Sequence, residues 1–145
     1  LGKSRFNRAW IRTQFMLGLC FKYSFLIIAV LAMISPLILI FYPFGVYQKQ
    51  IYWGMFWIHG LIFPIKMLGM IMMMGALRSG GDYFSAAVIE LGGMYLFSVP
   101  FTLIASLIWE WHPFAVFFIL SSEWIIKTLL IWWRFNQKAW LQRLI

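Results

Sequence analysis

The sequence has few charged residues and a single cysteine, and each shortage excludes a class of protein. Only 11% of its 145 residues are charged, whereas 63% are apolar and the mean hydropathy is +0.85. Ordinary soluble domains carry about 25% charged and about 45–50% apolar residues, so a soluble globular domain is excluded. The one cysteine, Cys20, lies within an apolar run. The sequence therefore predicts neither an intrachain disulfide nor a thiolate metal site.

Acidic residues are scarcer than basic ones, with 4 Asp and Glu against 12 Lys and Arg and a net charge of +8. The basic residues lie in short segments between apolar runs and form no single patch, which argues against a nucleic-acid partner. Neither histidine has Cys, His or carboxylate companions at metal-ligand spacing. No nucleophile-base-carboxylate set and no phosphate-loop lysine is visible. We therefore expect no metal, no cofactor and no enzymatic activity.

Long apolar runs are what the sequence has in abundance. A bilayer core about 30 Å thick needs about 20 apolar residues at 1.5 Å per residue. Four runs meet this length, at residues 19–41, 51–77, 83–109 and 113–133. The sequence predicts an all-α membrane protein with four transmembrane helices. A basic interfacial lead-in at residues 1–18 and a basic tail at 134–145 flank them.

The basic residues outside the runs predict the orientation. Lys49 lies on one side of the predicted membrane. The residues on the other side are Lys3, Arg5, Arg8, Arg12, Arg78, Arg134, Lys138 and Arg143. By the positive-inside rule, both ends of the chain and the Arg78 loop are cytoplasmic. We expect a multi-pass protein of the plasma (cytoplasmic) membrane.

Glycine and proline positions predict the local geometry. Gly80 and Gly81 can adopt the left-handed conformation that ends a helix, and Asp82 can cap the next helix by accepting its free N–H groups. This short turn predicts a tight antiparallel hairpin of the second and third spans. Prolines inside spans remove a backbone hydrogen bond and bend the helix, so they are hinge candidates. They are Pro36, Pro64 and Pro100.

The string from Gly75 to Asp82 resembles a cytoplasmic loop of the multidrug and toxic compound extrusion (MATE) transporters. The matching residues are Gly75, Leu77, Arg78, Gly80, Gly81 and Asp82. The resemblance extends over nearly the whole chain and implies helices nine to twelve of a twelve-helix, two-lobe transporter, whose N-terminal helices would be the partners of this segment. The first residue is Leu1, which fits a piece of a longer chain.

The resemblance implies an antiporter that exports cationic or amphipathic drugs or metabolites by alternating access, driven by H⁺ or Na⁺. The second span lacks the carboxylate that some sodium-coupled members carry there, so the coupling ion stays open. A lipid-linked flippase of the same superfamily is the close alternative. A small structural subunit of a membrane complex is a third reading.

Charged residues within spans need an explanation because they are costly in lipid. Glu123 and Lys127 form an i, i+4 pair, and Lys127 can also extend to the inner interface. Lys66 and Glu90 lie roughly 17 Å and 11 Å from the Gly turn along their helices. They form either a structural ion pair within the hairpin or a polar site facing a transport cavity.

One stripe of the second span collects the other candidates for a substrate or ion pathway. His59, Phe63, Lys66, Met70 and Met74 recur at helical spacing and therefore share one face. Such a stripe is often plain packing, but flexible methionines also suit a surface that binds many ligands.

Overall fold

The structure is a computed structural model that describes residues 6–137. Its elements are α1 (Phe6–Phe41), α2 (Val46–Met70), η1 (Ile71–Arg78), α3 (Tyr83–Gly92), η2 (Gly93–Ser98), α4 (Val99–Leu103), η3 (Ile104–Ile108) and α5 (Pro113–Asn136). The η elements are π-helical turns within longer helices, and no strand occurs in the described range. The predicted basic positions Lys3, Arg5, Lys138 and Arg143 lie outside the described residues.

Four continuous helices are long and apolar enough to cross a membrane, which confirms the all-helical, four-span prediction. They cover Trp10–Phe41, Val46–Arg78, Tyr83–Ile108 and Pro113–Asn136. Because α1 is unbroken from Phe6, the described part of the basic lead-in continues directly into the first span. Their outward faces expose large apolar side chains such as Ile40 and Leu61, as lipid contact requires.

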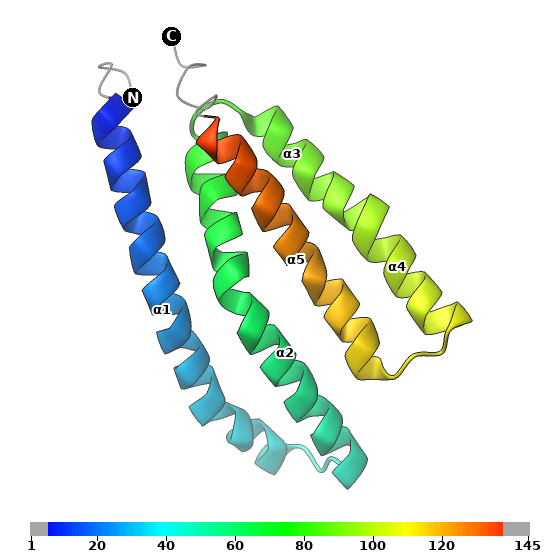
Figure 1. Cartoon of the computed structure of the whole chain (residues 1–145). Helices are drawn as coiled ribbons and strands as arrows, with labels where there is room; N and C mark the ends of the chain where they lie inside the picture. Colours follow the sequence, from blue (N-terminus) through cyan, green and yellow to red (C-terminus); the bar gives the residue numbers. More distant parts are fainter. Residues whose placement is uncertain (1–5, 138–145) are drawn as a thin grey trace.

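The order of the helices in space differs from their order in the chain. Figure 1 shows α5 lying between α2 on one side and the α3–α4 helix on the other, and α5 contacts both. The predicted tight hairpin of the second and third spans is therefore present where η1 contacts α3, and it is wrong farther from the turn, where α5 lies between the two spans. The physical reason is three glycines: a β-carbon on Gly54 would collide with Phe114, one on Gly69 with Thr128, and one on Gly93 with the Lys127 stem. Small residues at these contacts let α5 approach both neighbours closely.

The turn after η1 is a Schellman motif. The Asp82 N–H donates to the Leu77 carbonyl at 2.9 Å, and the Gly81 N–H donates to the Arg78 carbonyl at 3.2 Å. Gly81 has a φ of 86°, so the left-handed residue predicted for this turn is Gly81. The predicted cap by Asp82 is wrong, because its carboxylate makes no hydrogen bond to the α3 backbone. That carboxylate binds side chains instead, as described below.

The three prolines lie where the sequence placed them. Pro36 lies within α1 and Pro64 within α2. Pro100 lies in α4, and π-helical turns precede and follow it. Because proline supplies no N–H and clashes with the carbonyl four residues earlier, a widened turn accommodates it. The hinge role of all three prolines stays a prediction.

The tightest core lies near the Gly turn, where four helices meet. Its buried residues are Leu17, Met72, Met73, Ala76, Leu77, Ala86, Ile131 and Phe135. Trp10 of α1 stacks on Phe135 of α5, with ring centroids 4.8 Å apart. This end of the bundle is therefore fixed, and the opposite end is joined by fewer buried side chains.

Candidate functional site

A pocket with several polar side chains in its walls lies between α2 and α5. It has a volume of about 260 Å³. Its lining residues are His59, Ile62, Lys66, Phe117, Leu120, Ser121, Glu123 and Trp124. Five of these side chains, including the indole of Trp124, can donate or accept a hydrogen bond, and the other three are aliphatic or aromatic. Mostly apolar walls with a few convergent polar groups are typical of small-molecule sites.

The pocket lies near the middle of the spans. At 1.5 Å per residue, Glu123 lies about 15 Å along α5 from Pro113, and Lys66 about 18 Å along the second span from Arg78. Half of a hydrocarbon core is about 15 Å thick. Lys66 and Glu123 are therefore near the middle of two candidate spans, the part of a membrane-spanning helix where charge is most costly.

Glu123 and Lys127 form the i, i+4 ion pair that the sequence predicted. Their side chains are only 9% and 6% exposed. The alternative in which Lys127 extends to the inner interface is therefore wrong. The Lys127 stem instead crosses Gly93, where the missing side chain leaves room for it.

Trp124 connects the two lysines of the site. The Lys66 Nζ lies 5.1 Å from the centre of the Trp124 ring, and the Lys127 Nζ lies 5.2 Å from it. Both distances are within the range of a cation–π interaction. For Lys66, no ion pair is present within residues 6–137, so the indole ring is the group that stabilises its charge there.

The wall of the pocket is anchored to α2 by a hydrogen bond between helices. The Thr128 hydroxyl of α5 donates to the Ile65 carbonyl of α2 at 3.1 Å. Pro64 lies next to Ile65 in this helix, and Gly69 allows the close approach of Thr128. This contact fixes Lys66 and Trp124 relative to one another.

The structure divides the predicted stripe of the second span. His59 and Lys66 line the pocket. Phe63, Met70 and Met74 are not among its lining residues; Phe63 packs near His59 at 5.9 Å between ring centroids, and Met74 is exposed. Met72 and Met73, in contrast, are fully buried in the core.

Sequence reasoning missed Ser121 and Trp124. Ser121, Trp124 and Thr128 follow one another at steps of three and four, which places them on one face of α5. That spacing, together with the charged pair Glu123 and Lys127, was the available signal. It identifies α5, as well as the second span, as a source of pocket residues.

Glu90 does not pair with Lys66. Its Oε2 accepts a hydrogen bond from Arg78 Nη2 at 2.7 Å, and the two side chains are 38% and 39% exposed. The structural ion pair predicted between Lys66 and Glu90 is therefore wrong. The reason is the position of α5, which separates α2 from the helix that carries Glu90.

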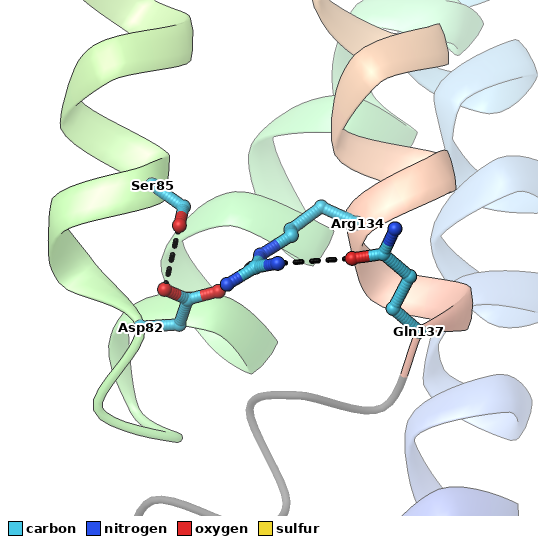
Figure 2. A network of polar contacts seen from close by, with 4 residues as sticks. All are labelled: Asp82, Ser85, Arg134 and Gln137. Atoms are coloured by element: carbon cyan, nitrogen blue, oxygen red, sulfur yellow. Dashed lines mark hydrogen bonds and ion pairs between the residues drawn. The ribbon is translucent and has the colours of Figure 1, made fainter.

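A second polar network lies at the Gly-turn end of the bundle. Figure 2 shows Asp82 between two donors: Ser85 donates its hydroxyl to Oδ1 at 2.7 Å, and Arg134 donates Nε–H to Oδ2 at 2.7 Å. Arg134 also donates to Gln137 at 2.9 Å. The Asp82 side chain is fully buried, so this pair ties the start of α3 to the end of α5. Arg78 and Asp82, the two charged residues of the string from Gly75 to Asp82, thus both form ion pairs.

The described part of the chain holds no group of three His, Cys, Asp or Glu residues placed to bind a metal ion. Comparisons with protein-family models, curated proteins and solved structures found no match to this chain. These comparisons therefore identify no family, and the resemblance of the string from Gly75 to Asp82 to MATE transporters stays an expectation from the sequence.

Proposed function

We propose that this chain is part of a secondary transporter that exports small amphipathic or cationic organic compounds by alternating access, in exchange for H⁺ or Na⁺. One observation carries the proposal: a pocket with charged side chains in its walls lies near the middle of two helices that are long and apolar enough to span a membrane. Ionisable groups at this depth mark substrate and ion pathways, and substrate sites of transporters lie near the bilayer midplane.

The cost of these charges supports a functional reading. A lysine or acidic residue at the centre of a spanning helix costs about 2.5–3.5 kcal/mol on insertion scales. Glu123 and Lys127 offset part of that cost by pairing with one another. Lys66 contacts the Trp124 ring and no carboxylate among the described residues, so its charge is better explained by a ligand than by the stability of the bundle.

The third span supplies a feature that suits a moving helix. It alternates α-helical and π-helical turns around Pro100. Such turns occur often at functional sites, because their weaker hydrogen-bond geometry lets a helix change its direction. The half-exposed Arg78–Glu90 pair can open at the cytoplasmic end, while the buried Asp82–Arg134 pair holds α3 to α5.

The MATE resemblance completes the proposal. It supplies a twelve-helix, two-lobe transporter of the plasma membrane, in which the missing N-terminal helices form the other wall of the cavity. Both ends of this segment face the cytoplasm. The excess of basic residues on the side of the Gly turn supports this orientation.

Flux measurements in liposomes test the proposed function. The full-length protein that contains this segment is reconstituted, a pH or Na⁺ gradient is imposed, and the efflux of one fluorescent amphipathic cation and one fluorescent amphipathic anion is followed. We expect gradient-dependent efflux that Lys66→Met abolishes and Lys49→Met, outside the bundle core, preserves. If neither gradient drives either dye, the chain is not a secondary transporter, and the structural-subunit reading is favoured.

A further inference from the structure

We propose that the pocket between α2 and α5 binds the carboxylate, or a similar single negative charge, of a small amphipathic compound. Lys66 is the counter-charge, and the Trp124 and Phe117 rings contact the apolar body. This inference rests on the proposed function, because it narrows the class of compound that the transporter would carry. The binding itself is argued from the geometry of the pocket alone.

The charges of the pocket favour an anion. The site and its wall contain two ammonium groups, Lys66 and Lys127, and one carboxylate, Glu123. Glu123 is already neutralised by Lys127 in a buried pair. The Lys66 ammonium has the Trp124 ring within 5.1 Å, and the ion pairs of residues 6–137 do not include it. The remaining positive charge would repel an organic cation that enters the pocket, whereas an anion would neutralise that charge.

The neutral polar groups are also suited to an anion. Ser121 is 8% exposed and lines the pocket, as does the imidazole of His59. A hydroxyl and a neutral imidazole can each donate one hydrogen bond, and Lys66 can donate three. A carboxylate offers two acceptor oxygens, so Lys66 and either neutral donor can satisfy it together.

Size and depth narrow the ligand further. A volume of about 260 Å³ is at the small end of ligand pockets and accepts an aromatic acid with one ring. Lipid phosphates stay at the interface, about 15 Å from the middle of the bilayer. Because the pocket is near mid-depth, its ligand is a small organic acid that enters the site and not the headgroup of a bilayer lipid.

Three planar probes of nearly equal shape test the assignment: benzoate, benzamide and benzamidinium. Each is titrated by calorimetry into the purified full chain in detergent, with chloride as a fourth, inorganic anion. We expect benzoate to bind most tightly and benzamidinium least. Charge-assisted hydrogen bonds are about twice as strong as neutral ones, so Lys66→Gln should weaken benzoate by at least about tenfold. The same change should weaken benzamide less than benzoate, because neutral benzamide loses a charged hydrogen-bond donor but no ion pair.

Two further variants separate charge from folding. Lys66→Arg keeps the charge and should retain most of the benzoate affinity. Lys22→Gln removes a lysine that is exposed on α1 and should change nothing. The order of the three probes on the unmodified chain is informative even if Lys66→Gln does not fold.

Several results would overturn the proposal: benzamidinium binding as tightly as benzoate, chloride binding as tightly as benzoate, or undiminished benzoate binding by a folded Lys66→Gln variant. None of these measurements needs an ion gradient. Benzoate binding through Lys66 without gradient-driven efflux would contradict the proposed transport function alone. Efflux of the cationic dye without benzoate binding would contradict the anion site alone.

Discussion

The buried ion pair between Asp82 and Arg134 should hold the Gly-turn end of the bundle together. Asp82→Asn is the informative change, because asparagine keeps the size of the side chain and an oxygen that can accept from Ser85. It removes the negative charge opposite Arg134 and the oxygen that accepts the hydrogen bond from Arg134 Nε–H. Any loss of stability is then due to the weakened contact with Arg134 and not to a cavity.

The expected loss follows from burial. Removing one partner of a buried pair costs about 3–5 kcal/mol, because the other charge is left uncompensated. The Asp82 side chain is 0% exposed, but that of Arg134 is 24% exposed and also binds Gln137. Arg134 therefore keeps part of its solvation, and we expect a loss near the lower end, about 3 kcal/mol.

The assay is the free energy of unfolding in mixed detergent, with the exposed pair as a matched control. Arg78 and Glu90 form an ion pair of the same 2.7 Å length, but both side chains are more than a third exposed. Glu90→Gln should therefore cost less than about 1 kcal/mol. Equal losses for Asp82→Asn and Glu90→Gln, or a loss below about 1 kcal/mol for Asp82→Asn, would refute the argument that burial sets the value of these pairs.

Two other predictions concern orientation and close packing. In a background without the native cysteine, a cysteine at Gln48 should react with an impermeant thiol reagent added outside cells, and a cysteine at Ser79 should not react. The opposite labelling pattern would contradict the predicted orientation of the chain in the membrane. Gly93→Ala should lower the melting temperature because its β-carbon meets the Lys127 stem, whereas Gly92→Ala, with open space around the β-carbon, should leave it unchanged or raise it. Equal effects of the two alanines would show that α5 does not pack closely there.

Much of the fold could be predicted from the sequence, because the sequence features that determine it lie within single helices or turns. The length of the apolar runs gave four spanning helices, and Gly81 marked the turn between two of them. The i, i+4 spacing of Glu123 and Lys127 gave their ion pair. Each of these features depends on residues within one helix or one turn, so no knowledge of tertiary packing was needed.

The order of the helices was not readable in the same way. In a soluble bundle the apolar face of each helix indicates its neighbour, but a helix in lipid is apolar on every side. The close contacts of α5 depend instead on three glycines, which are Gly54 and Gly69 on α2 and Gly93 on the third span. One sequence does not show which of its 11 glycines face a neighbouring helix, and so the hairpin was wrongly expected to be closed.

The same error changed the candidate site. With α5 outside the hairpin, Lys66 and Glu90 appeared to face one another; with α5 inside it, Lys66 faces Trp124. The sequence located Lys66 and His59 correctly on one face of the second span, and both line the pocket. The opposite wall, Ser121 and Trp124, depends on a contact between helices 55 or more positions apart, which periodicity within one helix does not reveal.

A double-mutant cycle on Glu90 tests this arrangement most directly. If α5 separates the two helices, Glu90→Gln and Lys66→Met should change the free energy of unfolding independently, and their effects should add within about 0.5 kcal/mol. Glu90→Gln and Arg78→Gln remove the two partners of one ion pair, so either change alone should already cost the whole free energy of that pair. The coupling energy between the two changes should therefore approach the full value of a half-exposed pair, up to about 1 kcal/mol. Both cycles share Glu90→Gln, so any general effect of that change cancels between them. A coupling larger with Lys66 than with Arg78 would mean that the second and third spans meet face to face in the membrane, and that α5 does not lie between them.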